Sequence, residues 1–459
     1  MSLKLRPLFP RLRESKYRGS ETWKPSLAQL SVAQTDEIIS KGSNFKPDRL
    51  IFALIDLSRV SSPSGPALSI LASRCSDSSN LFFPPQIIET LTLFSTISFS
   101  DPTLFKFLTL RKDDVLNEAS PRRLVLLIEA LSQLHLPIFH ESIWTPIREN
   151  LVRVLPELKR GIPNLVRSLA SQGCPDSELM HALVKQGELN WKSGEIEHSV
   201  FVSLIEAASR SSLLRDEVVR LVDESKSTRF TDRQSLVLYV ASNRVGVNTS
   251  RFSASSLFED KFNAARSIEL LSRLEARLDV PLESAISDSI ETFSRDTDYL
   301  KKFASFNLDS LSRISTQQDQ LISIMLNGMD PVLDLLSGEK LFHLARAARM
   351  VKADDSKIKE KLKPLVKQLT VRQSRLLWEC GMGNMDNLFA LPPLMPLGKE
   401  HLELDTVVVG PYTLERKKNE TSLSLRVPLY QQGDRGIELR RQALEEESGT
   451  LVTLEYTDF

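Results

Sequence analysis

The chain has 459 residues, and its 59 lysine and arginine side chains balance 59 aspartate and glutamate side chains. Hydrophobic residues make up 41% of it, which is enough for a folded core and excludes a wholly disordered protein. The zero net charge argues against a protein that coats nucleic acid with its whole surface, although it can conceal local asymmetry. Glycine is scarce, at 17 residues, which favours helices over tight turns and phosphate-cradling loops.

The first 24 residues are strongly basic, with seven basic and two acidic side chains and a net charge of +5. A basic, acid-poor segment interleaved with leucines is typical of a mitochondrial transit peptide. Pro7 and Pro10 interrupt a regular helix there. We predict that residues 1–44 form a basic arm or a transit segment, with a solvated tail as the alternative. The arm cations predicted to contact RNA are Lys4, Arg6, Arg11, Arg13, Lys16 and Arg18.

The middle of the chain repeats one pattern, a polar start followed by an apolar stripe at helical spacing. The first stripe residues are separated by 37, 37, 38, 38 and 36 positions, and later copies near Ala264 and Leu341 drift. A period near 37 fits two short helices and two turns, and such hairpins bury their apolar faces by stacking. We predict a mainly α fold, an α-solenoid over residues 45–390, with a bundle of unrelated helices as the alternative. The stripe residues are Leu50, Ile87, Leu124, Ile162, Val200 and Leu236.

Second helices are predicted between these first helices, at Ser177–Glu188 and Leu213–Glu224. Ser120 followed by Pro121 is typical of a helix start, because the hydroxyl caps the helix and proline is tolerated in its first turn. Aromatic residues lie mostly in the apolar stripes, so we predict core positions for them rather than base stacking. Examples are Phe52, Phe94, Phe201 and Phe342.

The C-terminal region changes character after the proline-rich segment Leu391–Gly398. Its β-branched or alternating segments predict three strands, and Gly436–Glu447 predicts a helix before the last of them. The order strand, strand, helix, strand predicts a small α/β unit over residues 399–459, which carries a net charge of −4. The predicted strands are Thr406–Val409, Ser422–Val427 and Thr450–Tyr456.

The repeats resemble the heptatricopeptide class of organellar helical-hairpin proteins, relatives of the octotricopeptide and pentatricopeptide families. In that class, side chains on inner helices often contact RNA. The resemblance rests on the apolar segments Leu50–Leu57, Ile87–Phe94, Leu124–Leu131 and Leu341–Ala348.

The C-terminal unit resembles a RAP domain, the small module that commonly follows heptatricopeptide repeats. The family pattern is a strand that enters an acidic-Gly-Pro turn, then a helix rich in basic residues and leucine, then a Gly-led strand. Val407–Val409 and Leu439–Arg441 match the first strand and the helix. The remaining motif positions are Gly410, Pro411, Leu444, Gly449, Tyr456 and Phe459.

RAP domains resemble a restriction-endonuclease-like fold, in which carboxylates on the first strands hold a divalent cation. Here Val407 and Val409 stand where the family tends to carry acids, and valine cannot bind a hard cation. We therefore predict no catalytic residue, no metal and no cofactor; Asp405 and Glu403 would serve only after a register shift. Phosphate contacts are predicted instead from a basic helix face, which includes Arg435, and a basic turn. The predicted contact residues are Arg416, Lys417, Lys418, Arg440 and Arg441.

Motifs for nucleotide, dinucleotide and zinc-protease chemistry are absent from the sequence, and its three cysteines are far apart. No stretch is long and apolar enough to span a membrane, and no small-molecule substrate is expected. The resemblance implies a non-enzymatic RNA-associated scaffold in the mitochondrial matrix. It favours a structural component of the mitochondrial ribosome that contacts rRNA through its arm and C-terminal unit and proteins through its solenoid. The alternative is an accessory scaffold of a respiratory or ATP-synthase complex without RNA; the missing acids disfavour an RNA-processing nuclease.

Overall fold

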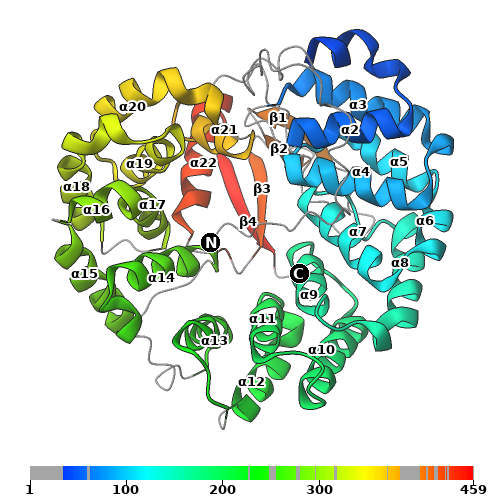
Figure 1. The fold of residues 1–459 in the computed structure, drawn as a ribbon, viewed down its shortest axis with the longest axis horizontal. Helices are drawn as coiled ribbons and strands as arrows, with labels where there is room; N and C mark the ends of the chain where they lie inside the picture. The colour runs from blue at the N-terminus through cyan, green and yellow to red at the C-terminus, as the bar shows by residue number, and fades with distance from the viewer. Residues whose placement is uncertain are drawn as a thin grey trace, which may run out of the picture.

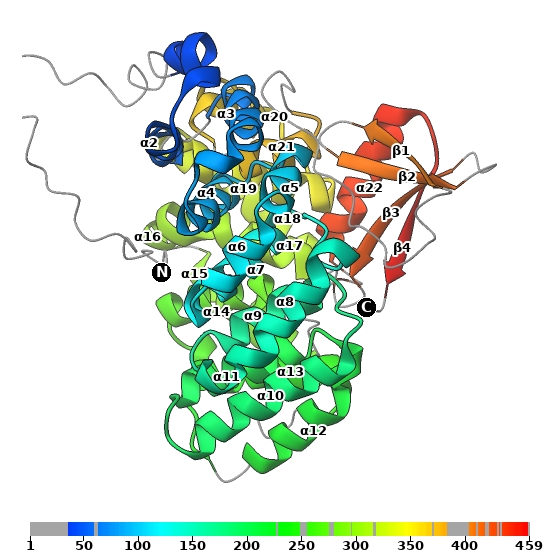
Figure 2. The ribbon, with the colours of Figure 1, turned by 90° about the vertical axis from the view of Figure 1, so that its right-hand side faces the viewer.

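The described chain is mainly helical and carries a four-stranded sheet near its C-terminus. The helices follow one another around a ring, and the sheet lies against one face of that ring (Figure 1 and Figure 2). This confirms the prediction of a mainly α chain with a small C-terminal sheet. The computed structural model describes residues 35–58, 63–225, 228–247, 255–274, 280–294, 296–314, 318–369, 371–382, 404–409, 412–417, 422–428, 431 and 434–457.

An inner row of helices lines the ring, and each member packs against the next member of the row. These are the helices that the apolar stripes predict, with Ser305–Ile314 added between the two late copies. The row consists of α2 (Pro47–Ser58), α4 (Pro84–Ile97), α7 (Pro121–Gln133), α9 (Ile162–Ser171), α11 (His198–Ala208), α13 (Asp232–Val245), α14 (Lys261–Arg273), α17 (Ser305–Ile314) and α19 (Gly338–Val351).

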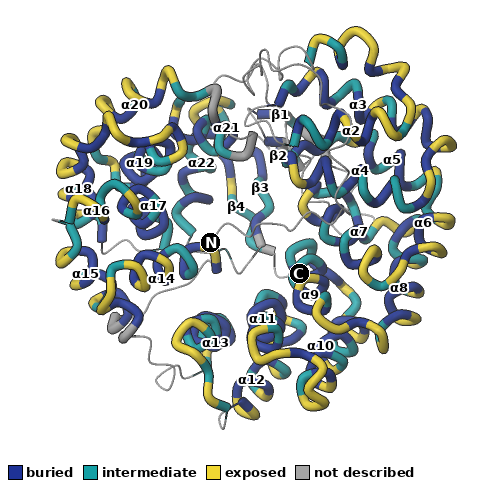
Figure 3. The backbone as a smooth tube through the Cα atoms, in the orientation of Figure 1, coloured by how far each residue is buried: buried dark blue, intermediate teal, exposed yellow. Residues whose placement is uncertain are grey.

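An outer row forms the rim of the ring, where many exposed residues lie (Figure 3). The two predicted second helices correspond to α10 and α12 of this row. The row consists of α3 (Gly65–Asp77), α5 (Pro102–Thr109), α6 (Lys112–Glu118), α8 (Glu141–Val154), α10 (Ser177–Lys192), α12 (Arg215–Glu224), α15 (Val280–Phe293), α18 (Asp319–Gly328) and α20 (Ser356–Leu362).

Short elements connect the two rows, and one more helix, α21 (Val371–Trp378), follows α20. The helix α16 (Thr297–Tyr299) runs into a π-helical turn, η7 (Leu300–Ala304), that leads to α17. The 3-10 turns are η1 (Gly42–Asn44), η2 (Ser79–Leu81), η3 (Leu155–Glu157), η4 (Ser212–Leu214), η6 (Ser255–Phe258), η8 (Asp330–Leu335) and η9 (Lys363–Gln368).

Local chemistry explains where the inner helices begin and which face they bury. The Ser120 hydroxyl accepts a hydrogen bond from the backbone N–H of Arg123 at 3.4 Å, as the sequence predicts for the start of α7. The predicted stripe residues are buried, apart from Val200, which is half-buried. Phe52 is 46% exposed, so its predicted core position is wrong. It lies on α2, which begins the row and therefore has an inner-row neighbour on one side.

The folded body begins before the boundary predicted for the N-terminal arm. Residues 35–41 are already helical, and Ile38 is buried. Gly42 packs so closely that a Cβ atom there would lie 3.0 Å from Ile70 Cγ2. Residues 35–44 therefore belong to the helical array, whereas the predicted arm cations, all within residues 1–34, lie outside the described residues.

The sheet has the order β1–β2–β3–β4, with antiparallel neighbours except for the parallel pair β3–β4. The helix α22 (Arg435–Ser448) makes the crossover between the two parallel strands. The observed order is therefore strand, strand, strand, helix, strand, one strand more than predicted. The strands are β1 (Leu404–Val409), β2 (Tyr412–Lys417), β3 (Leu423–Pro428) and β4 (Val452–Thr457).

The strand missing from the prediction is β2. Arg416 and Lys417, predicted to lie in a basic turn, are strand residues paired with Asp405 and Leu404 of β1. The residues just before Lys418 are Glu415, Arg416 and Lys417, and Leu414 is the apolar residue that precedes them. The alternation of apolar and polar residues is therefore too short to indicate a strand, and the segment resembles a charged turn. Tyr412 and Leu414 are nevertheless buried, because they face the apolar cluster under α22.

Candidate nucleic-acid interface

The predicted basic face of α22 turns toward the helical ring rather than toward solvent. Arg440 donates from Nε to the buried carboxylate of Glu379 at 2.8 Å, and its guanidinium lies 4.7 Å from the centre of the Tyr412 ring. Arg435 pairs with Asp319 of α18 at 2.5 Å and also donates to the backbone carbonyl of Met350. These cations hold the C-terminal unit to the ring, which corrects the prediction of an exposed basic face.

Arg441 is satisfied within α22 itself. It pairs with Glu438 and, at 2.7 Å, with Glu445. Two further ion pairs join α22 to inner helices, Asp434 with Arg313 at 2.5 Å and Glu446 with Arg349 at 3.4 Å. The C-terminal unit is therefore docked on α17, α18 and α19 by alternating charges, and its arginines are largely neutralised there.

The remaining predicted site residues of the C-terminal unit have structural positions where the structure describes them. Arg416 is half-buried, with its Nε enclosed. Leu444 is fully buried under the sheet, Gly449 ends α22 in the left-handed conformation at φ 62°, and Tyr456 is half-buried. The described residues do not include Lys418, Gly410, Pro411, Phe459 or the side chain of Lys417.

The two valines at the expected acid positions lie in an apolar environment. Val409 is buried and Val407 packs against the cluster formed by Tyr412, Leu414 and Leu444. A carboxylate pair at these positions would be desolvated unless a cation accompanied it. Among the residues described, no group of three or more His, Cys, Asp or Glu side chains is arranged to hold a metal ion.

A buried polar junction connects the last helix of the array to its first repeats. Arg375 of α21 donates to the backbone carbonyl of Ser98, the residue that ends α4, at 2.9 Å. The neighbouring Glu379 accepts a hydrogen bond from the Tyr412 hydroxyl at 2.5 Å. His135, which follows α7, is held by burial and by the charges of Arg375 and Arg440 at a pKa of about 4. The ring is therefore closed where α21, the sheet and the turns after α4 and α7 meet.

An alternating ladder of charges crosses the inner helices. Glu206 of α11 accepts from Arg167 of α9 at 2.9 Å, from Arg210 at 2.8 Å and from Arg244 of α13 at 3.0 Å. Burial of Glu206 tends to raise its pKa, but the three guanidinium charges outweigh burial and hold the pKa well below its ordinary value. Glu129 of α7 extends the ladder toward Arg167, with a pKa raised mainly by burial.

This ladder was not predicted, although the sequence contains a signal for it. Glu129, Arg167, Glu206 and Arg244 follow one another at 38, 39 and 38 positions, close to the repeat period, and their charges alternate. Equivalent positions of stacked repeats lie side by side, so alternating charges at the repeat period predict ion pairs between adjacent helices. The sequence offers no comparable signal for the junction at Arg375, because its partner is 277 residues away.

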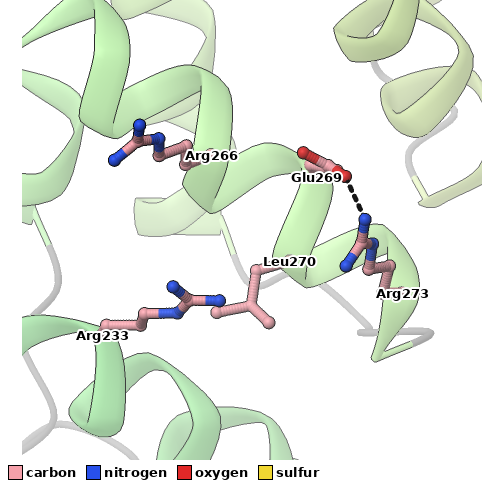
Figure 4. Close-up of a pocket in the computed structure, with 5 residues that line it drawn as sticks. All are labelled: Arg233, Arg266, Glu269, Leu270 and Arg273. Atoms are coloured by element: carbon pink, nitrogen blue, oxygen red, sulfur yellow. Dashed lines mark hydrogen bonds and ion pairs between the residues drawn. The ribbon is translucent and has the colours of Figure 1, made fainter. Parts of the chain in front are cut away.

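A small surface pocket between α13 and α14 is lined by three arginines (Figure 4). Arg233 comes from the first turn of α13, and Arg266 and Arg273 come from α14. Arg273 pairs with Glu269 at 2.5 Å, and Leu270 lies among the arginines. None of these residues was singled out from the sequence, where exposed cations on helices are common and give no distinguishing pattern.

Two further findings bear on function. In the described part of the chain, no helix has the length and apolarity that crossing a bilayer requires. Comparison with protein-family models and with curated proteins gives no match to this chain.

Proposed function

We propose that the chain is a non-catalytic, RNA-associated scaffold of the mitochondrial matrix, most consistent with a structural component of the mitochondrial ribosome. In this proposal the ring is an α-solenoid of the heptatricopeptide type, and the C-terminal unit is a degenerate RAP-like domain. The repeat of helical pairs, the order of the two parts and the valines at the acid positions support the assignment.

The observation that carries the scaffold proposal is the closed ring. Arg375 ties α21 to the turn after α4, and Arg440, Glu379 and Tyr412 tie the C-terminal unit to the same junction. The arginines of α22 in the C-terminal unit are paired with carboxylates of the ring or of α22 itself, so we assign this unit a role in holding the ring together and no role in catalysis. We accordingly assign rRNA contact chiefly to the arm cations of residues 1–34, and protein contact to the rim of the ring.

The test is co-sedimentation of the tagged full-length protein from a mitochondrial lysate. The proposal expects the protein to travel with ribosomal RNA on a sucrose gradient and to be released by RNase or by high salt. Persistence with a membrane-embedded complex after RNase would instead support the accessory-scaffold alternative. Metal-dependent RNA cleavage that is abolished by Asp405→Asn would contradict the non-catalytic assignment.

A further inference from the structure

We propose that Arg233, Arg266 and Arg273 form a phosphate-binding site for the backbone of single-stranded RNA. The inference rests on the proposed function, since it gives the helical ring itself a point of contact with RNA. It adds a site for which the sequence provided no candidate residue, because the predicted contacts were confined to the arm and the C-terminal unit.

The pocket has a local excess of positive charge. It combines three guanidinium groups with one carboxylate, that of Glu269, and the three arginines are exposed. The three side chains come from two adjacent helices and lie around Leu270 (Figure 4). A single anion placed over Leu270 would therefore face guanidinium groups from both α13 and α14.

The charges of Arg233 and Arg266 are not compensated within the described chain. Neither side chain forms a hydrogen bond or an ion pair with any residue that the structure describes. Other arginines of the inner helices are paired, as Arg167 and Arg244 are with Glu206, but the exposed Arg122 and Arg123 of α7 form no ion pair with a described residue either. What distinguishes Arg233 and Arg266 is that they line one pocket together with Arg273, and this convergence of positive charge points to a partner outside the chain.

The position of Arg233 adds a second argument. It is the second residue of α13, a helix of 14 residues that begins with a capping box between Thr231 and Gln234. The N-terminal end of a helix carries partial positive charge, which disfavours a cation and favours an anion. Asp232 and the capping box already offset part of the helix charge, so a bound phosphate would chiefly offset the guanidinium charge of Arg233.

The chemistry of the pocket suits a phosphodiester. Arginine presents a planar fork of donors that matches two phosphate oxygens, and Arg273 keeps further N–H donors after pairing with Glu269. Leu270 offers an apolar surface on which a ribose or base can lie. A carboxylate would match the same fork, so the choice of RNA rests on the apolar surface of Leu270 and on the proposed function, and an acidic peptide is treated as an outcome of the test.

The test compares two double variants of the full-length chain. Arg233→Gln/Arg266→Gln removes two charges from the pocket, and Lys106→Gln/Lys185→Gln removes two exposed charges from the outer helices α5 and α10. The probe is a fluorescein-labelled oligouridylate of about 20 nucleotides, and binding is measured by fluorescence anisotropy over a range of salt. We expect the pocket variant to bind about tenfold more weakly, with the salt slope reduced by about 1.4. The control should change affinity less than twofold.

Competition identifies the anion, using inorganic phosphate and polyglutamate as unlabelled probes. Weak competition by millimolar phosphate, with none by polyglutamate, is the expected result. Equal affinity for inorganic phosphate and RNA would replace the RNA site with a small-anion site, and pocket-dependent binding of polyglutamate would replace it with an acidic-protein site. Both results would overturn the proposal.

The outcomes separate the pocket from the proposed function. If the wild-type chain binds the probe and the pocket variant binds equally well, or both double variants lose affinity equally, the pocket is not the site while the RNA-associated function stands. If the wild-type chain neither binds RNA nor travels with ribosomal RNA, both proposals fail. Unchanged thermal unfolding of the variants checks that the loss is not one of folding.

Discussion

Glu206 shows how a buried carboxylate is retained in the helical ring. Its side chain is 1% exposed, and it faces three guanidinium groups, two of which are themselves less than 10% exposed. Attraction to the three guanidinium groups offsets the desolvation cost of the carboxylate. Losing either the carboxylate or the arginines would therefore leave buried charge without a partner. Removing the carboxylate alone would leave three arginines around one another without a counter-charge.

We therefore predict that Glu206→Gln lowers the free energy of unfolding by about 3 kcal/mol, as is typical for breaking a buried ion pair. The matched control is Glu195→Gln, since Glu195 pairs with Lys159 at 3.3 Å on the surface and both side chains are at least 43% exposed. We expect the control to cost less than about 1 kcal/mol. Urea unfolding followed by circular dichroism measures both, and equal losses would contradict the structural role of the ladder.

At the scale of elements, adjacent residues of α22 are expected to behave differently. Arg440 reaches Glu379, which is buried outside the C-terminal unit, whereas Arg441 pairs with acids of its own helix. We predict that Arg440→Ala detaches the C-terminal unit and costs about 3 kcal/mol, because a buried carboxylate loses its charged partner. Arg441→Ala should cost less than about 1 kcal/mol.

Hydrogen exchange with mass spectrometry measures this difference. In Arg440→Ala, the peptides of α22 and β2 should lose protection, while those of α9 and α11 stay unchanged. Protection that falls equally in the Arg441→Ala variant would mean that the docking of α22 depends on its total charge and not on the Glu379 contact. Either arginine acting chiefly on RNA would instead change RNA affinity with no change of exchange.

The elements were predictable to different degrees, for physical reasons. The inner helices other than α17 were located from the sequence because a helix buries a continuous stripe, and Leu124 and Leu236 each mark one turn of such a stripe. The strand β2 was missed because two buried residues, Tyr412 and Leu414, are too few to establish a period against polar neighbours. Phe52 was misplaced because its exposure depends on where the row of helices begins, which periodicity does not express.

At the scale of the whole molecule, the curvature of the ring decides which residues meet. Each inner helix packs against the next, and the row bends round until α21 reaches the turn after α4 (Figure 1). No local pattern encodes that curvature, so the sequence predicted the inner helices without the junction. The α13–α14 pocket was likewise hidden, since it depends on how two helices from separate repeats are juxtaposed.

The closure of the ring is expected to depend on pH through His135. Burial and the nearby charges of Arg375 and Arg440 lower its pKa in the folded chain to about 4, against 6.5 for an ordinary histidine. Between these values the unfolded chain binds a proton that the folded chain does not. The stabilising contribution is therefore complete above pH 6.5 and is lost as the pH falls toward 4.

We predict that the wild-type chain loses up to about 3 kcal/mol of unfolding free energy from this group between pH 6.5 and pH 4. His135→Asn should remove that part of the pH dependence, because asparagine does not titrate and tolerates the left-handed backbone at φ 53°. Urea unfolding at half-unit steps of pH measures the difference between the two proteins. The free energy of unfolding of the wild type, relative to that of the variant, should fall steadily on acidification. Parallel profiles of the two proteins would instead show that His135 is exposed to solvent and that the ring is open at this junction.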